Sequence, residues 1–303
     1  MSKLQLGRHS VEISNEDKIL FPDAGITKGD LIEYYRCIAE VMLPHIRDRA
    51  ITMQRFPDGI QEDGFFQKDA SDYFPDWIDT VKVRKKGGTV THVIANDSAT
   101  LAYLANQACI TPHVWLSRTD QLDHPDMIVF DLDPPEDDIE MLCRTAKAVR
   151  KMLNELDLTA FVKTTGSRGL HVISPLDRGA DFDVVRQFAK DVAGAIAVRD
   201  SENLTTEPRK NKRRGRMFLD TARNAYAQTI VAPYAVRARP GAPVATPLDW
   251  DEVDGSGNIS QRFTMKNIFR RLGQKDDPWK NIRRSAKSLK TPLNRLGDLL
   301  EER

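Results

Sequence analysis

The sequence predicts a mixed α/β fold, because strand-like and helix-like patterns alternate along its 303 residues. The apolar runs 127–130 and 217–219 have the length of buried strands. Apolar residues recur at helical spacing through 137–156 and 183–197, which predicts amphipathic helices between strands. The composition, 40% apolar and 29% charged, is typical of a folded enzyme.

Composition and charge narrow the class of protein. No stretch approaches the roughly 18 unbroken apolar residues of a membrane span, and the N-terminus has no apolar signal segment, so a cytoplasmic protein is expected. Cys37, Cys109 and Cys143 are odd in number and far apart, which indicates free thiols rather than disulfides or a zinc site. The net charge is +1, yet basic residues gather at 82–86 and 209–216, as on a local nucleic-acid surface.

The N-terminal third predicts two helices and a hairpin. Thr27 begins a capping-box pattern, so a helix is expected to follow it and to end at Pro44. Asp97 is expected to cap a second helix that ends near Gln107. Two central glycines and alternating apolar residues make 82–95 typical of a β-hairpin. No internal repeat and no long linker separates independent domains.

Two carboxylates close the strand predicted at 127–130. Asp131 and Asp133 are two positions apart, and side chains at that spacing in a strand share a face. Two prolines then end the strand, at the edge where open α/β sheets place their chemistry. Carboxylate oxygens without neighbouring cysteines favour Mg²⁺ or Mn²⁺. The alternative is a turn-starting pair that caps the next helix.

A third acid, Asp220, ends the apolar strand 217–219. Three acids on two strand ends are the ligand set that a two-metal site needs to bridge a triphosphate. The alternative for Asp220 is a helix-capping aspartate.

A glycine-marked turn, 164–171, lies between the acidic strands. Its glycines allow the backbone to approach an anion, Thr165 and Ser167 supply hydroxyl groups, and Arg168 supplies charge, as a triphosphate requires. The alternative is a plain hairpin turn. His171 alternates with apolar neighbours, so it is expected to leave the core face that they share.

Three more residues are candidates for phosphate or nucleotide contacts. Arg237 and Arg239 are expected on one face of an extended segment, where they could clamp phosphate oxygens. His113 is either a structural loop histidine or a nucleotide contact.

In this order along the chain, D-L-D-P-P, T-T-G-S-R-G-L-H, F-L-D-T-A-R-N and V-R-A-R-P resemble the polymerase domain of bacterial and archaeal ligase D, in the archaeo-eukaryotic primase superfamily. The likeness covers nearly the whole chain. It implies an α/β catalytic core with an RRM-like module and an active cleft between the sheets. It also implies template-directed gap filling and 3′-end extension at DNA double-strand breaks during nonhomologous end joining, with two manganese (or magnesium) ions and a preference for ribonucleotides.

The resemblance also assigns residues to roles. Asp131, Asp133 and Asp220 become the catalytic metal ligands. Around the incoming nucleotide stand His113, Thr165, Ser167, Arg168, His171, Arg223, Arg237 and Arg239. Thr165 replaces the serine usual in the family but keeps a hydroxyl group, so phosphate binding is expected to survive.

For the DNA, the resemblance gives the downstream 5′-phosphate to Lys18, Lys28 and Asn15. Lys28 at a helix N-terminus would add its charge to free backbone amides. Phe65 and Phe66 are expected to point in opposite directions, one into the core and one onto bases, with both buried as the alternative. Backbone contacts are expected from Arg55, Lys82, Arg84, Lys85 and Lys86. The run 209–216 could equally be a solvated loop.

We expect one primase-polymerase-like domain over 1–303, with DNA-binding elements mainly in about 1–110, catalytic motifs in about 111–240 and a C-terminal packing segment in 241–303. By resemblance, the partners are gapped duplex with a 5′-phosphate, NTPs, Ku, an ATP-dependent ligase and a 3′-phosphoesterase, at the bacterial or archaeal nucleoid. No ligase lysine motif is evident, and a standalone protein and an excised domain are both open. Three other functions stay open: a de novo primase, a two-metal nuclease or phosphoesterase, and a non-catalytic DNA-end-binding module.

Overall fold

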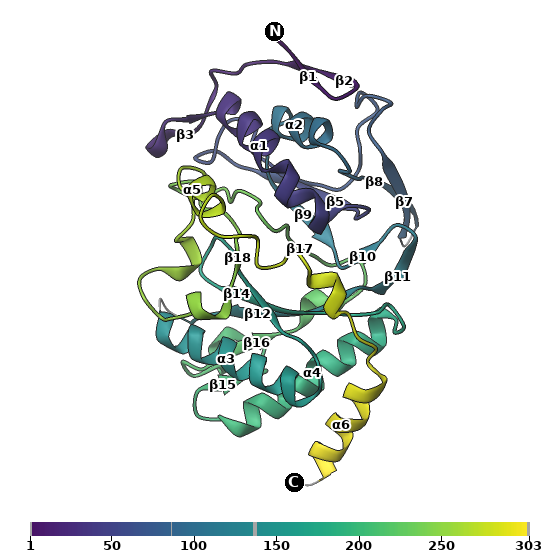
Figure 1. The fold of residues 1–303 in the computed structure, drawn as a ribbon, viewed down its shortest axis with the longest axis vertical. Helices are drawn as coiled ribbons and strands as arrows, with labels where there is room; N and C mark the ends of the chain where they lie inside the picture. The colour runs from purple at the N-terminus through teal and green to yellow at the C-terminus, as the bar shows by residue number, and fades with distance from the viewer. Residues whose placement is uncertain (1, 86, 136–137, 302–303) are drawn as a thin grey trace. The chain divides into compact units, whose positions relative to one another are not determined.

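The computed structural model describes residues 2–85, 87–135 and 138–301. These form a mixed α/β chain (Figure 1) that divides into two compact units. Unit 1 comprises Met1–Asp120, Thr229–Ala245 and Phe263–Lys275; unit 2 comprises Gln121–Gln228, Thr246–Arg262 and Asp276–Arg303. Both units are discontinuous in sequence, whereas the subdivision expected above was contiguous. The functional roles expected for its three parts stay a prediction.

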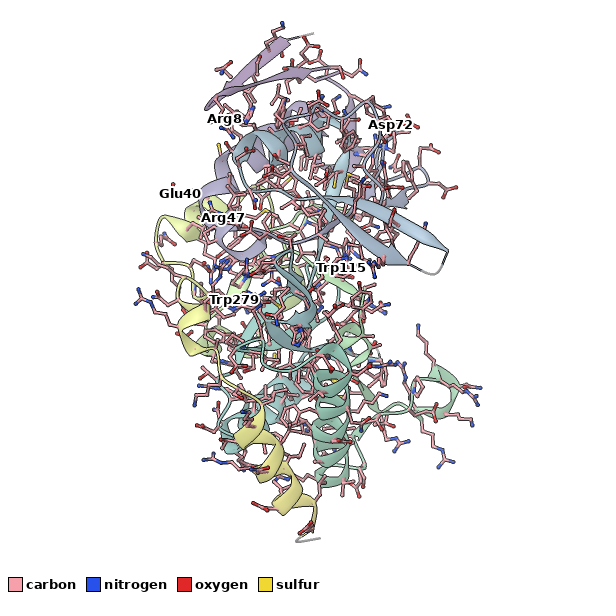
Figure 2. All side chains as sticks on the ribbon, turned by 90° about the vertical axis from the view of Figure 1, so that its right-hand side faces the viewer. Arg8, Glu40, Arg47, Asp72, Trp115 and Trp279 are labelled. Carbon is pink, nitrogen blue, oxygen red and sulfur yellow. The ribbon has the colours of Figure 1, made fainter. Side chains whose placement is uncertain are left out.

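The main sheet of unit 1 has the described strand order β17-β9-β5-β8-β7, and β6 also pairs with β5. Its strands are β5 (Ile51–Arg55), β6 (Phe65–Gln67), β7 (Thr80–Lys85), β8 (Gly88–Val93), β9 (Cys109–Trp115) and β17 (Thr229–Val231). The smaller elements are β1 (Ser2–Leu6), β2 (His9–Ile13), β3 (Ile19–Phe21), β4 (Ile26–Thr27), β10 (Ser117–Arg118) and α5 (Ile268–Leu272). The predicted hairpin is confirmed as β7–β8, which projects from the rest of unit 1 (Figure 2).

Two helices of unit 1, α1 (Lys28–Ile46) and α2 (Ser98–Asn106), lie side by side (Figure 1). Thr27 and Asp97 cap them as predicted, Thr27 through a complete capping box. α1 does not end at Pro44 but continues to Ile46. A proline in the last turn costs only one intrahelical hydrogen bond, which buried neighbours in this helix can offset.

The main sheet of unit 2 has the described order β15-β16-β12-β14-β13-β18. Its strands are β12 (Met127–Asp133), β13 (Phe161–Thr164), β14 (Leu170–Pro175), β15 (Leu204–Thr205), β16 (Met217–Asp220) and β18 (Pro247–Leu248). The other elements are β11 (Gln121–Pro125), α3 (Ile139–Glu155), α4 (Phe182–Arg199) and α6 (Lys290–Glu301). The two helices predicted from periodicity are confirmed as α3 and α4, which pack on the sheet (Figure 1).

β12 is antiparallel to both of its neighbours, β14 and β16. The predicted acidic strand therefore exists, with Asp131 and Asp133 as its last residues before the prolines. It does not belong to the open parallel sheet in which strand ends collect at one edge. Its acids meet others by cross-strand pairing instead.

Each unit contains a buried tryptophan, Trp115 in unit 1 and Trp279 in unit 2 (Figure 2). In unit 2, Trp279 Nε1 donates a hydrogen bond to the Val162 carbonyl at 3.1 Å, which ties the C-terminal segment to β13. No helix in the described part of the chain is long and apolar enough to cross a membrane.

In unit 1, the fully buried Arg49 connects α1 to β9. Its Nε donates to the His45 carbonyl at 3.0 Å, and its Nη1 donates to the Trp115 carbonyl at 3.1 Å. The His45 carbonyl lies in the last turn of α1, where carbonyl groups lack intrahelical partners. Arg49 therefore both ends the helix and joins it to the sheet.

Arg49→Leu should lower the free energy of unfolding by about 3 kcal/mol, because two charge-assisted hydrogen bonds are lost in the interior. Urea unfolding followed by circular dichroism measures this. Arg49→Lys keeps the charge but cannot reach both carbonyls, so an intermediate loss is expected. A midpoint unchanged in Arg49→Leu would contradict the bridging role.

Candidate active site

A row of charged side chains crosses the sheet of unit 2. Asp131 on β12 lies opposite His171 on β14 and opposite Asp220 on β16. Lys163 on β13 lies opposite His171. Residues paired in register point to the same face, so these four side chains form one line. Asp133 follows two positions after Asp131 and therefore shares this face.

Asp131 is buried and has two cationic or hydrogen-bonding neighbours. His171 Nε2 lies 3.3 Å from its Oδ1, and Arg223 Nε lies 3.3 Å from its Oδ2. Burial alone would raise the pKa of Asp131, but the charge and hydrogen bond of His171, followed by those of Arg223, outweigh it and lower the pKa to about 2. Asp131 is therefore ionised at neutral pH.

His171 lies on the face predicted for it, opposite Leu170 and Val172, but that position is buried rather than exposed. Burial and the charge of Lys163 lower the pKa of His171 to about 4. The neutral ring can still donate its Nε2–H to Asp131. Its Nδ1 has no hydrogen-bond partner among the described residues.

The other two acids have pKa values raised by burial and by the charge of Asp131. Asp133 and Asp220 thus lie where added positive charge would be favourable. The capping alternative for the first pair is wrong, because Asp138 is the residue that caps α3. Asp220 does accept the Ala222 amide at 2.7 Å, so it stabilises the following turn as well as facing Asp131.

The predicted anion loop is organised by its threonine. Thr165 Oγ1 donates to the Gly169 carbonyl at 3.0 Å and accepts the Ser167 and Gly169 amides at 3.3 and 3.2 Å. The hydroxyl is buried in these contacts, so the structure places it inside the turn. Arg168 is exposed, and its charge lowers the pKa of Asp133 in part, which places it close to that carboxylate.

Gly169 lies against the acidic strand. A Cβ atom at this position would be 2.1 Å from the Leu132 carbonyl oxygen and 2.7 Å from Asp133 Oδ1. Only glycine leaves room for both the backbone and the carboxylate. The second glycine of the loop is therefore required by the position of Asp133.

Two site residues were not identified from the sequence. Asn224 is fully buried, and its side chain accepts the Val129 amide at 2.8 Å and donates to the Val129 carbonyl at 2.6 Å. This double contact imitates a strand partner and holds the turn that carries Arg223 beside β12. The asparagine directly after that arginine was the available signal.

Lys163 is the other missed residue. It has no exposed surface and occupies the end of the charged row next to His171. A lysine directly after the apolar residues of a predicted buried strand was the available signal, since lysine is rarely fully buried.

Three predicted nucleotide contacts, His113, Arg237 and Arg239, belong to unit 1 and stay predictions. His113 packs edge-on against Phe66, with ring centroids 5.4 Å apart. Arg237 lies beside the antiparallel bridge between Val236 and Val244, and its amide donates to the Pro243 carbonyl at 2.8 Å. Arg239 instead begins a turn in which the Ala242 amide donates to its carbonyl at 3.0 Å, so it does not continue the extended segment expected.

The predicted 5′-phosphate residues lie together in unit 1. Lys28 is buried, and its ammonium group donates to Ser14 Oγ and to the Asn106 carbonyl, both at 3.2 Å. The expectation of free helix amides was wrong, because the Lys28 amide donates to the Lys18 carbonyl and the Gly29 amide to the Glu16 carbonyl. Lys18 forms an ion pair with Asp58 at 2.6 Å.

Asn15, which precedes this pair, has a left-handed backbone with φ 51°, and its carbonyl accepts the Lys18 amide at 3.1 Å. The turn at Asn15 thus helps to fix the position of Lys18.

Both members of the Phe65–Phe66 pair are exposed, so neither enters the core and the buried alternative is wrong. On β7, the exposed Lys82 and Arg84 share one face of the strand, while Lys85 is exposed on the opposite face, which also carries the buried Val83. Lys86 lies outside the described residues.

Two other charged segments have local explanations. In the basic run 209–216, Arg213 stacks on Phe218 at 4.1 Å and donates to two loop carbonyls. Asp249, Asp251 and Glu252 approach one another within 4.8 Å, but Asp249 and Glu252 form the capping box of a short helical turn.

Comparison with known proteins decides the family. The sequence model of one protein family, the LigD primase-polymerase domain, matches residues 27–279 of this chain. This chain belongs to the LigD primase-polymerase family. Membership makes it a DNA-directed nucleotidyltransferase that depends on metal and uses NTPs.

Individual LigD relatives agree. The multifunctional non-homologous end joining protein LigD of Mycolicibacterium smegmatis is 37% identical over 246 residues, which are 80% of this chain and 32% of the relative. The bifunctional LigD of Bacillus subtilis is 31% identical over 283 residues, 91% of this chain and 45% of that protein. The chain thus spans less than half of the length of these relatives.

A solved structure shares the fold. The polymerase domain of Mycobacterium tuberculosis ligase D, in complex with DNA, matches with a TM-score of 0.85 and 32% identity, over 91% of this chain and 99% of that one. The mixed α/β prediction and the predicted LigD resemblance are confirmed.

Replacing Gly169 tests whether its close approach to β12 is needed for activity. We expect Gly169→Ala to reduce nucleotide addition at least a hundredfold and to lower thermal stability, because the methyl group displaces β12 beside Asp133. Primer-extension rates and thermal unfolding measure the two effects.

The matched control is Gly194→Ala in α4, where a Cβ atom meets nothing within 4 Å. It should keep full activity and gain about 0.5–1 kcal/mol in stability. Equal activity of the two variants would show that the close approach at Gly169 is not needed.

Proposed function

We propose that this domain fills gaps and extends 3′ ends at DNA double-strand breaks during nonhomologous end joining, by template-directed addition of nucleotides with a preference for ribonucleotides. The observation that carries the proposal is the pairing of Asp131 with Asp220 directly across antiparallel strands, with Asp133 on the same face. In this reading the primer 3′-hydroxyl attacks the α-phosphate of a bound NTP, and pyrophosphate leaves.

The site fits divalent cations. The three side chains offer only carboxylate oxygens, which suit Mg²⁺ and Mn²⁺. The raised pKa values of Asp133 and Asp220 and the space kept open by Gly169 beside Asp133 support the same conclusion. Asp131, Asp133 and Asp220 would hold two ions, which would activate the attacking hydroxyl group and stabilise the leaving pyrophosphate.

The remaining residues act on the substrate or on the acids. Arg223, with 43% of its side chain exposed beside Asp131, and the exposed Arg168 supply cations for triphosphate oxygens. His171 holds Asp131 ionised and in one orientation through its Nε2 contact. Asn224 keeps Arg223 in place through its two bonds to Val129. His113, Arg237 and Arg239 are assigned to the nucleotide by family resemblance.

On the DNA side, Lys18, Lys28 and Asn15 bind the downstream 5′-phosphate in this proposal. Burial and the charge of Lys18 lower the pKa of Lys28, which supports this assignment, since a phosphate dianion beside Lys28 would offset both effects. Lys82, Arg84 and Lys85 contact the duplex backbone. Mn²⁺ is the proposed ion, and Ku, a ligase and a phosphoesterase are the proposed partners.

Asp131→Ala should reduce extension of a gapped duplex at least a hundredfold, because a shared ligand and several kcal/mol of transition-state stabilisation are lost. Incorporation of labelled NTPs in the presence of Mn²⁺ measures this. Asp251→Asn, in the acidic cluster explained by capping, is the control and should retain wild-type activity. Undiminished extension by Asp131→Ala would sink the assignment.

Selectivity for a 5′-phosphate should weaken at high pH. Burial and the charge of Lys18 lower the pKa of Lys28 below its ordinary 10.5, so its positive charge is present below that lowered pKa and lost above it. We expect the affinity ratio between 5′-phosphate and 5′-hydroxyl duplexes to fall before the pH reaches 10.5, as measured by fluorescence anisotropy.

Lys28→Arg is the control for this titration, because its guanidinium group stays charged throughout the range. Its affinity ratio should stay constant. The same decline in both proteins would show that Lys28 does not read the phosphate.

A further inference from the structure

The guanidinium group of Arg55 is directed toward its own protein neighbours in unit 1. Nε donates to the Gln107 carbonyl at 2.7 Å, and Nη2 approaches Gln107 Oε1 at 3.4 Å. Nη1 donates to Gln67 Oε1 at 2.7 Å and approaches the Tyr73 hydroxyl at 3.4 Å. A guanidinium group has five N–H donors. These contacts use four of them, so one N–H is left, and a two-pronged contact to a phosphate would have to displace an existing partner.

The same side chain supports the ring of Phe65. Arg55 and Phe65 lie directly opposite each other on β5 and β6, and the guanidinium carbon is 5.5 Å from the ring centroid. A cation behind an aromatic ring fixes the orientation of that ring. Phe65 nevertheless keeps 46% of its surface exposed.

Tyr73 is fixed in the same network. Its hydroxyl group donates to Gln107 Oε1 at 3.3 Å, and its ring packs edge-on against Phe74 with centroids 5.2 Å apart. The segment just before Tyr73 is fixed by Gln67, whose Nε2 donates to the Asp69 carbonyl at 2.8 Å and to Ser71 Oγ at 2.9 Å. Yet 62% of Tyr73 is exposed. Its ring is held in place at one edge and open to solvent elsewhere.

Exposed aromatic side chains concentrate in this region. Within the described residues the large exposed aromatics are Phe65, Phe66, Tyr73, Tyr226 and Phe269, and the first three belong here. Asp72, next to Tyr73, is exposed at the periphery of unit 1 (Figure 2) and disfavours a phosphate there. The uncharged face of a nucleobase suits such a surface, since bases stack on aromatic rings whatever their sequence.

We propose that Tyr73 stacks on an unpaired base of single-stranded DNA beside Phe65, and that Arg55 is the positioning residue that holds both rings. The proposal rests on the proposed function, because it assumes a DNA substrate, and it extends the base-stacking role that the family resemblance gives to the Phe65–Phe66 pair. It adds Tyr73 to that surface and gives Arg55 a role other than the backbone contact expected from the sequence.

The first test measures binding of a duplex with a single-stranded overhang by fluorescence anisotropy. Tyr73→Ala should weaken binding roughly five- to a hundredfold, the range for one base-stacking ring. Tyr73→Phe keeps the ring and should stay within a few-fold of wild type. Phe269→Ala, which removes an exposed aromatic ring elsewhere in unit 1, should bind as wild type. Equal binding by Tyr73→Ala and wild type would overturn the stacking role.

The second test separates positioning from phosphate contact for Arg55. Each lost phosphate contact on single strands should reduce the slope of log affinity against log salt concentration by about 0.7. Arg55→Gln should weaken overhang binding without changing this slope. Its effect should also be smaller in a Tyr73→Ala background, because both changes disrupt one surface. A reduced slope with additive effects would make Arg55 a phosphate contact.

The outcomes separate this inference from the proposed function. Extension by the wild type, with overhang binding unaffected in Tyr73→Ala, would end the stacking proposal and leave the polymerase proposal intact. If Tyr73→Ala loses overhang binding but the wild type cannot extend a gapped duplex, the stacking proposal stands and the polymerase proposal fails. Each variant should unfold at the same midpoint temperature as the wild type, which excludes misfolding as the cause of a change in binding.

Discussion

Two carboxylates, Asp131 and Asp220, face each other across adjacent antiparallel strands, and much of unit 2 is arranged around that pairing. Like charges directly opposite in a sheet are destabilising. Arg223 offsets part of this cost with its positive charge and His171 with its hydrogen bond to Asp131, while the pKa of Asp220 stays raised. The site thus has a deficit of positive charge on one face of the sheet. A divalent cation would remove that deficit, which links the stability of the site to its chemistry.

Two neighbouring turns fix this geometry. Gly169 lets β14 approach Asp133, and the Thr165 hydroxyl closes the turn that carries this glycine. Asn224 joins the turn after Asp220 to β12 through Val129. The acids are therefore positioned before any substrate arrives, as electrostatic catalysis requires.

The local patterns in the sequence predicted the elements well, because capping boxes, apolar periodicity and proline stops act over a few residues. They could not give the register between strands, so the row from Lys163 to Asp220 was not foreseen. Contacts from distant backbone also overturned local reasoning. Carbonyl groups at 16 and 18 accept the helix amides that Lys28 was expected to share. A local turn at 239–242, in contrast, ends the segment that was expected to stay extended. Both Phe65 and Phe66 are exposed on the three-residue strand β6, and no pattern in the sequence predicts that neither ring is buried.

Direct titration with Mn²⁺, followed by electron paramagnetic resonance, is the measurement closest to the central claim that the paired acids form one cation site. The wild type should remove free Mn²⁺ from solution. Asp220→Asn and Asp133→Asn should each weaken that binding at least tenfold, although the two residues lie on different strands. Wild-type binding in both variants would show that the pairing of β12 with β16 does not build a metal site.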